Sequence, residues 1–148
     1  MSILIDTNVL LRSVQPSHPM HAVAVRALET LLKREEPLFV ALQNVAEFWN
    51  AATRPIANNG LEFTIEEVQA EVAKIEGFFQ VLTENTESYS AWKTLLGAQR
   101  VRGVQVHDAR LVAVMKTHGI AQVVTFNVAD FDRFPGIEAV HPAKIIGP

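Results

Sequence analysis

The stretch Ile3-Leu4-Ile5-Asp6-Thr7-Asn8 decides the fold, because a short apolar run ends abruptly in an acid followed by two small polar residues. Three successive apolar residues indicate a strand that is buried on both faces, as in the middle of a parallel sheet covered by helices. Ligands of open α/β sheets bind just outside the carboxyl ends of such strands. The sequence therefore predicts that Asp6 is a site residue at the tip of a buried strand.

Composition narrows the class of protein. The chain has 148 residues, 49% of them hydrophobic and 20% charged, which is typical of one globular domain over residues 1–148. Cysteine is absent, which excludes disulfides and thiolate metal sites and favours a cytoplasmic protein. No apolar run reaches the roughly 18 residues of a membrane-spanning helix. The net charge of −3 disfavours a nucleic-acid partner unless the acids cluster around a metal ion.

Apolar spacing along the rest of the chain predicts short buried strands that alternate with helices. We expect helices over 21–34, 43–53, 64–77, 86–100 and 107–118, and strands over 38–40, 78–82, 121–125 and 139–141. Strands that alternate with helices pair in parallel through right-handed crossovers. The sequence therefore predicts an α/β protein, a three-layer α/β/α sandwich with a central, mostly parallel sheet.

Asp108 is the second acid of interest, because it starts a predicted helix on the same face as the apolar residues Leu111, Val112 and Met115. A carboxylate in the first turn is stabilised by the exposed N–H groups by roughly 0.3–1 kcal/mol, so a capping role accounts for it equally well. An acid that faces inward needs a partner, since burial of an unpaired charge is costly, and a metal ion meets that need.

Glu47 lies on the helix predicted to follow the strand at 38–40. Gln43, Asn50 and Arg54 share its side of this helix and fit an ordinary solvated polar face. Topology favours another interpretation, because the first turns of this helix lie near the sheet edge at which Asp6 is placed. Glu47 is therefore either a surface acid or a member of the same crevice as Asp6.

Four short segments, in this order along the chain, resemble the PIN-domain family and more closely its VapC-like toxin branch. They are Leu4–Leu10, Gln43–Asn50 followed by Ala52–Pro55, His107–Ala109, and Val124–Asn127 followed by Asp130–Phe131. The resemblance covers nearly the whole chain, and its specificity comes from the order and spacing of the segments. It implies a PIN-like fold and a metal-dependent endoribonuclease that is the toxin of a type II toxin–antitoxin pair.

The resemblance also implies roles for the acids around Mg²⁺ or Mn²⁺. Asp6 and Asp108 are expected as principal ligands, and Glu47 as a ligand or as a base acting through a water on the metal. These hard cations take oxygen ligands, and clustered carboxylates without a cation repel one another. Asn127 stands at a fourth family position that often carries an acid, with Asp130 three residues later. An amide oxygen ligates without adding charge, which leaves the number of ions, one or two, open.

Polar and basic residues close to the acids are candidates for substrate binding. Thr7 and Asn8 either orient Asp6 or bind a phosphate through hydrogen bonds, or they only cap the first helix. Arginine suits phosphate because its donors form a fork, although scattered surface arginines are common. The arginines near the acids in sequence are Arg12, Arg54, Arg100, Arg102 and Arg110.

The partners implied by the resemblance are an RNA substrate, a cognate antitoxin that lays a segment across the acidic crevice, and a second copy in a homodimer. Leu10, Leu11 and the stripe from Val23 to Leu32 are interface candidates or ordinary core. Three rival functions are a non-catalytic PIN scaffold that binds RNA or protein, a DNA-directed nuclease, and a receiver-like phosphotransfer domain. The three acids disfavour the scaffold, and the lack of paired acids before the end of the first strand disfavours the receiver.

Overall fold

The computed structural model describes residues 1–147 and contains one central sheet. Its strands are β1 (Ile3–Ile5), β2 (Leu38–Ala41), β3 (Gln80–Leu82), β4 (Gln122–Val124) and β5 (Glu138–Val140). They lie in the order β3-β2-β1-β4-β5, and each neighbouring pair is parallel. The predicted parallel sheet is confirmed, and β1 is its central strand.

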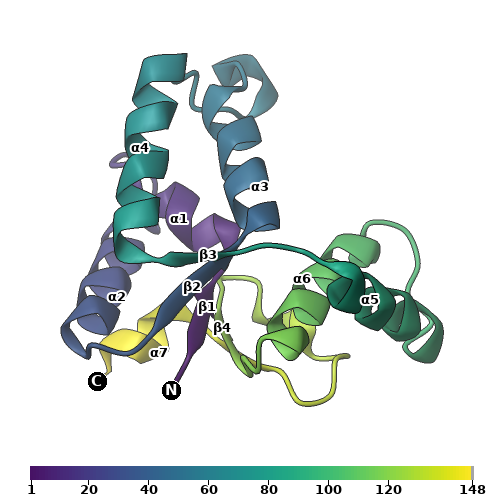
Figure 1. The fold of residues 1–148 in the computed structure, drawn as a ribbon. Coiled ribbons are helices and arrows are strands. Elements are labelled where there is room, and N and C mark those ends of the chain that lie inside the picture. Colours follow the sequence, from purple (N-terminus) through teal and green to yellow (C-terminus); the bar gives the residue numbers. More distant parts are fainter. Residues whose placement is uncertain (148) are drawn as a thin grey trace.

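Helices connect the strands and cover both faces of the sheet (Figure 1). They are α1 (Thr7–Ser13), α2 (His21–Lys33), α3 (Leu42–Thr53), α4 (Ile65–Phe78), α5 (Thr86–Ala98), α6 (Gln105–Thr117) and α7 (Pro142–Ile146). Short 3₁₀ helices at Ile56–Asn58 and Val128–Phe131 complete the described elements. The sandwich and all five helices predicted from residue 21 onward are confirmed, whereas α7 and the 3₁₀ turns were not predicted. None of the described helices is long and apolar enough to cross a membrane.

The side chains of β1 alternate between two apolar cores, one on each face of the sheet. Ile3 and Ile5 pack in the core that α1 to α4 and α7 cover, whereas Leu4 packs in the core beneath α6. Leu4 and Ile5 are completely buried. A strand without a polar face requires cover on both sides, which explains why this apolar run occupies the centre of the sheet.

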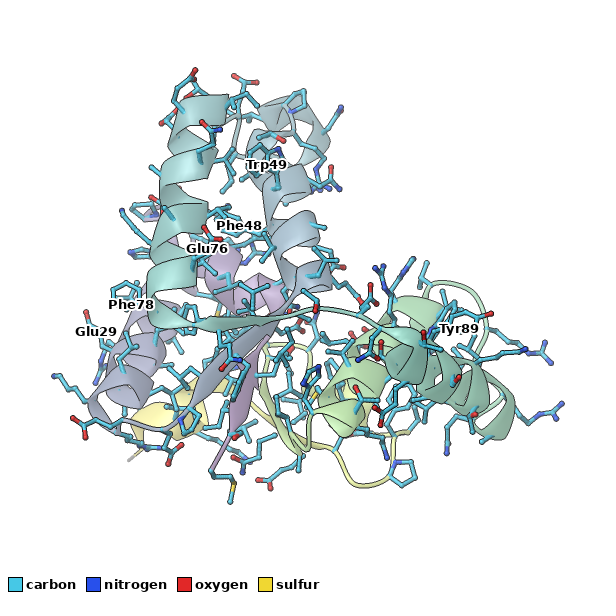
Figure 2. The ribbon with its side chains drawn as sticks, viewed as in Figure 1. Glu29, Phe48, Trp49, Glu76, Phe78 and Tyr89 are labelled. Atoms are coloured by element: carbon cyan, nitrogen blue, oxygen red, sulfur yellow. The ribbon has the colours of Figure 1, made fainter. Side chains whose placement is uncertain are left out.

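The helices α3 and α4 form a pair that projects beyond β2 and β3, and α5 and α6 lie on the other side of the sheet (Figure 1). Figure 2 shows Phe48 and Trp49 on α3, toward α4. Phe48 is fully buried in the same core as Val68 of α4, and Trp49 packs against that core. The apolar stripe on α3 therefore joins the pair to the sheet.

The carboxyl ends of the central strands lead almost directly into helices. Asp6 alone separates β1 from α1, and α3 begins at Leu42, immediately after β2 ends. The two ends of the drawn chain lie at the opposite, amino-terminal edge (Figure 1). There the backbone N–H of Ile3 donates to Pro37, and Arg34 donates to the carbonyl of Ile145 beside α7. Functional side chains at the strand–helix junctions are therefore gathered at one edge.

Candidate active site

Asp6 is held by hydrogen bonds to both oxygens of its carboxylate. Its backbone is extended, with φ −75° and ψ 156°, and it is the N-cap of α1. The backbone N–H of Thr7 donates to Oδ1 at 2.8 Å, and the hydroxyl of Thr125 donates to Oδ2 at 2.8 Å. The amide of Asn8 donates to Oδ2 at 3.4 Å. These donors come from α1 and from the end of β4, so they fix Asp6 at the sheet edge.

Thr7 links Asp6 to Glu47 through a short polar chain. Its hydroxyl donates to Oε1 of Glu47 at 2.9 Å and accepts a hydrogen bond from the Asn44 amide at 3.1 Å. Asn44 is fully buried, and its Oδ1 accepts from the backbone N–H of Ala41 at 2.8 Å. The junction of β2 and α3 thereby holds α1 and the carboxylate of Glu47 in a fixed relation.

Asn8 fixes the segment that follows β4. Its amide donates to the Thr125 hydroxyl at 3.1 Å, and its Oδ1 accepts from the backbone N–H of Phe126 at 3.1 Å. The Thr125 hydroxyl also accepts from the backbone N–H of Asn127 at 3.0 Å. Of the two interpretations of Thr7 and Asn8, the geometry agrees with orientation of Asp6, because Asp6 itself caps the helix.

Four acids line one pocket of about 320 Å³ at the carboxyl edge of the sheet. They are Asp6 after β1, Glu47 on α3, Asp108 in the first turn of α6 and Asp130 in the second 3₁₀ helix. Asn127 lines the same pocket. The structure therefore brings together the three principal acids and the asparagine singled out in the sequence, and it adds Asp130.

The environment of the pocket raises the pKa of two of these acids. Burial raises the pKa of Asp6 to about 6, and the charges of Glu47 and Asp130 act in the same direction, against the hydrogen bonds from Thr125 and Thr7. Burial also raises the pKa of Asp108 to about 6, together with the charges of Asp130, Asp6 and Glu47. A bound cation offsets the repulsion between carboxylates that raise one another's pKa in this way.

The donor set fits a hydrated divalent cation. Apart from Arg54, every polar side chain that lines the pocket in the described structure carries an oxygen donor. Oε1 of the buried Gln43 has no hydrogen-bond partner there, while the Gln43 amide donates to the carbonyl of His107. Within residues 1–147, no three His, Asp or Glu side chains converge closely enough to hold one ion between them. Mg²⁺ commonly keeps several waters and binds through one or two carboxylates, which agrees with this looser arrangement.

The candidate arginines are distributed unevenly around the pocket. Among the described residues, Arg54 is the one candidate arginine that lines the acidic pocket. Arg110 instead forms a two-point ion pair with Glu84, with both N···O distances 2.6 Å, and this arginine lowers the pKa of Glu84. Arg100 and Arg102 are exposed between α5 and α6. The structure therefore does not bring these last three arginines to the acids.

Two residues of the site carried no role in the sequence analysis. Thr125 is fully buried and donates directly to Asp6, and Asn44 donates to Thr7. Both lie in the segments that resemble the family. A usable signal for Thr125 is its position, because a hydroxyl at the end of a strand next to β1 meets the same sheet edge as Asp6.

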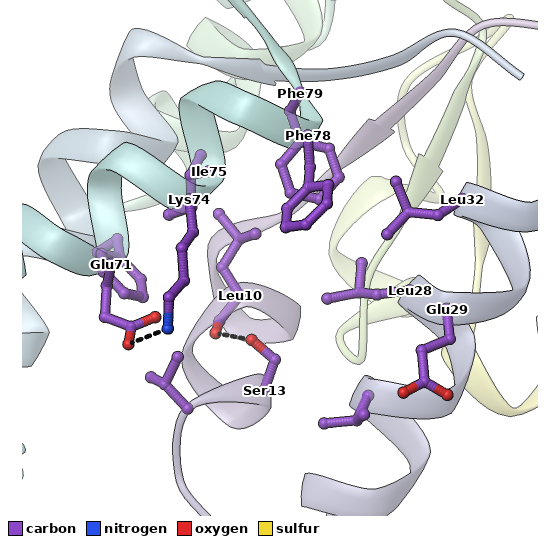
Figure 3. Close-up of a pocket in the computed structure, with 13 residues that line it drawn as sticks. Leu10, Ser13, Leu28, Glu29, Leu32, Glu71, Lys74, Ile75, Phe78 and Phe79 are labelled. Atoms are coloured by element: carbon purple, nitrogen blue, oxygen red, sulfur yellow. Dashed lines mark hydrogen bonds and ion pairs between the residues drawn. The ribbon is translucent and has the colours of Figure 1, made fainter. Parts of the chain in front are cut away.

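A second, more apolar pocket of about 330 Å³ lies away from the acids, between α1, α2 and α4 (Figure 3). Leu10, Leu28 and Leu32 line it together with Phe78. Leu10 is 2% exposed and belongs to the core, whereas Phe78 is 58% exposed. The apolar stripe of α2 is therefore core on one side and pocket wall on the other.

Comparison with known proteins identifies the family of this chain. The family model described as "PIN domain" matches residues 3–137. The chain belongs to the PIN-domain family. The PIN domain is 32% identical to Ribonuclease VapC13 of Mycobacterium tuberculosis over 139 residues, covering 92% of this chain and 97% of the relative. This relative places the PIN domain in the VapC branch that its sequence resembles.

Solved structures share the fold of this PIN domain. VapBC-1 from nontypeable Haemophilus influenzae aligns with a TM-score of 0.66 and 16% identity, covering 97% of this chain and 100% of that one. A toxin–antitoxin complex from Klebsiella pneumoniae aligns with a TM-score of 0.62 and 18% identity, covering 95% and 97%. At these identities the likeness concerns the fold alone.

Proposed function

We propose that this PIN domain, acting as one unit over residues 1–148, is a divalent-metal-dependent endoribonuclease and the toxin of a type II toxin–antitoxin pair. One observation carries the proposal: four carboxylates from four separate segments line a single pocket in which two of them have raised pKa values. Such a pocket suits a divalent cation and the phosphodiester that it activates. The ribonuclease name of the VapC13 relative supports RNA as the substrate.

The proposed roles follow the positions of the side chains. Asp6 and Asp108 are the principal ligands of Mg²⁺ or Mn²⁺, and Asn127 offers a further oxygen. When bound, the ion polarises the phosphoryl group and stabilises the departing 3′-oxygen. Glu47 is a ligand or the base: Thr7 holds its Oε1, and the carboxylate takes the proton of the attacking water. Thr7 and Asn8 fix Asp6 in place.

The proposal extends to the partners of the protein and to its place in the cell. The toxin–antitoxin complex of similar fold supports a cognate antitoxin, and the pocket between α1, α2 and α4 offers an apolar surface for part of it (Figure 3). We propose a homodimer in the cytoplasm as the form of the free toxin. Arg100 and Arg102, exposed beyond α5, are proposed contacts with more distant phosphates of the RNA.

The test is cleavage of a mixed RNA pool by the purified wild type, with Mg²⁺, with Mn²⁺ and with chelator. Asp6→Asn and Asp108→Asn keep the shape of each side chain and remove the charge, so each is expected to lower cleavage by about two orders of magnitude or more. Asp132→Asn is the matched control, because Asp132 is exposed near the site and does not line the pocket. It is expected to cleave like the wild type.

The outcomes separate the rival functions. Cleavage by the wild type that needs metal and disappears in both pocket variants supports the proposal. Equal cleavage by the wild type and both variants contradicts it and indicates a contaminating nuclease. Metal-dependent cleavage of single-stranded or duplex DNA, with RNA left intact, identifies a DNA-directed nuclease instead. Binding of RNA without cleavage of any substrate favours the non-catalytic scaffold.

A further inference from the structure

A third pocket adjoins the acidic one and has the opposite charge. It has a volume of about 390 Å³ and shares Leu11, Ala51 and Arg54 with the acidic pocket. Its remaining lining residues are Arg12, Gln15, His18, Asn59 and Leu61. In the described part of the chain, no Asp or Glu lines it. A chain with a net charge of −3 thus places a basic pocket directly beside its cluster of acids.

Arg54, which lies where the two pockets meet, is held firmly by the loop after α3. Its carbonyl accepts from the backbone N–H of Glu62 at 2.9 Å, and its guanidinium donates to the carbonyl of Asn59 at 3.2 Å. Gly60 packs so tightly that a Cβ there would lie 1.9 Å from the Arg54 carbonyl oxygen. The loop therefore fixes the position of Arg54 before any ligand binds, which lowers the entropic cost of binding.

One donor of this arginine lacks a partner. The Nε of Arg54 is buried, and within the described structure no hydrogen bond reaches it. A buried donor without an acceptor costs roughly 1–3 kcal/mol, and more when the group is charged. Guanidinium donors recognise phosphate oxygens by two parallel hydrogen bonds, so an anion at this position would remove the penalty.

Arg12 and His18 complete the basic pocket. The guanidinium of Arg12 donates to the side-chain oxygen of Gln15 at 2.5 Å, which anchors it on the pocket wall. Nδ1 of His18 accepts from the backbone N–H of Met20 at 3.0 Å. The neutral imidazole therefore carries its proton on Nε2 and is a donor there. Both groups offer hydrogens to an acceptor, as phosphate requires.

We propose that Arg54, with Arg12 and His18, forms a subsite for the phosphodiester next to the one that is cut in a single RNA strand. The inference rests on the proposed nuclease function and adds the residues that hold the strand. An acidic protein segment fits less well, because its carboxylates follow no fixed spacing along the chain. A nucleic-acid backbone carries its charges at regular intervals, so one phosphate lies at the metal site and the next at Arg54.

The first experiment measures binding apart from cleavage. In an Asp108→Asn background, the affinity for a short fluorescein-labelled single-stranded RNA is measured by anisotropy over a series of salt concentrations. The expected result for Arg54→Gln is a slope of log Kd against log salt that falls by about 0.7, the value for one lost contact with a single strand. Arg12→Gln should show a similar fall. Arg54→Lys keeps the charge and should retain most of the slope.

Arg26→Gln is the matched control, because it removes the same charge from an exposed position on α2 outside the basic pocket. A melting temperature within a few degrees of the parent confirms that each variant is folded. If Arg54→Gln and Arg26→Gln give the same slope, the subsite does not exist. If Arg54→Gln leaves the slope unchanged but weakens capture of a co-expressed antitoxin, the basic pocket binds a protein and the proposal is wrong.

A second experiment locates the phosphate. Neutral methylphosphonate linkages are placed one at a time along the RNA, and binding is compared between the Asp108→Asn protein and its Arg54→Gln derivative. If the subsite exists, a methylphosphonate at one linkage beside the cleavage point lowers the affinity of the Asp108→Asn protein. The same linkage leaves the affinity of its Arg54→Gln derivative unchanged. Uniform losses in both proteins overturn it. The nuclease proposal is tested separately: it fails if the protein that retains Asp108 cleaves no RNA.

Discussion

Asp6 carries two functions that a single carboxylate rarely combines, since it caps α1 and faces the other acids of the pocket. The donors from Thr7 and Thr125 stabilise its ionised form, while burial disfavours it. The balance leaves a carboxylate that is fixed in place yet holds its proton more tightly than an ordinary aspartate. A carboxylate with these properties is preorganised for the proposed cation.

Thr7→Val tests whether the hydroxyl bridge positions Glu47. Valine keeps the shape of threonine but cannot donate to Oε1 of Glu47 or accept from Asn44, whose amide then lies buried without that partner. We expect cleavage at saturating substrate to fall by about 10–100-fold, with a smaller effect on KM, because the geometry of Glu47, the proposed ligand or base, is disturbed. The measurement is steady-state cleavage of one RNA substrate.

Thr53→Val is a control on α3, because the Thr53 hydroxyl bonds only to the Trp49 carbonyl within its own helix. It should leave the rate unchanged. An unchanged rate in Thr7→Val would contradict the positioning role of the bridge.

At the scale of elements, the strand–helix junctions could be predicted and the turns could not. The apolar run before Asp6 and the apolar spacing over 64–77 are local patterns, and the structure contains the strand and the helix that they predict. β3 was predicted over 78–82 but begins at Gln80, because α4 continues through Phe78. Helix and strand compete for such a boundary, and tertiary packing decides it.

The residues of the site also divide into those that the local sequence predicts and those that it does not. Asp6 and Asp108 were found because their neighbours are apolar at strand or helix spacing, whereas the contact of Glu47 with Thr7 spans 40 positions. Contacts over such separations depend on the crossover geometry of the whole sheet. The partner of Arg110 illustrates the limit, since nothing in the local sequence distinguishes a phosphate-binding arginine from one that pairs with Glu84.

Gly60→Ala tests how the loop after α3 supports the site. A Cβ at this position would lie 1.9 Å from the carbonyl oxygen of Arg54, so the loop must shift. We expect the free energy of unfolding to fall by about 1–3 kcal/mol in denaturant titrations. RNA affinity should also fall, because the guanidinium moves with its backbone.

Gly97→Ala is the comparison for this prediction, since an added Cβ at Gly97 on α5 meets no atom within 4 Å. It should be neutral or stabilising, because alanine favours a helix over glycine. A Gly60→Ala protein as stable as the wild type would show that the loop adapts freely.

For the molecule as a whole, the raised pKa values of Asp6 and Asp108 predict how stability depends on pH without metal. Both pKa values rise from 3.8, the ordinary value of an aspartate in an unfolded chain, to about 6 in the fold. Between these values the folded chain holds protons that the unfolded chain has lost. The free energy of unfolding therefore falls as pH rises from about 4 to 6 and stays low above that. Asp6 accounts for roughly 3 kcal/mol of this fall, and Asp108 adds less because it is partly screened by water.

Chemical denaturation in chelator at pH 4.5 and pH 8 checks this prediction. Mg²⁺ should raise the melting temperature at pH 8 and do so much less at pH 4.5, where protons compete for the same oxygens. Asp6→Asn should flatten the pH dependence and abolish most of the metal effect. A wild type whose stability rises steadily with pH in chelator would contradict the raised pKa values.

Both ends of the chain lie at the amino-terminal edge of the sheet (Figure 1), opposite the carboxyl edge that holds the acidic pocket. A fluorescent protein or an affinity tag fused at either end therefore leaves the acidic and basic pockets uncovered. The same arrangement allows two copies of the chain, or the chain and a second protein, to carry different labels for energy-transfer measurements. The proposed dimer formation and antitoxin capture then become measurable in living cells, with the carboxyl edge of the sheet left free.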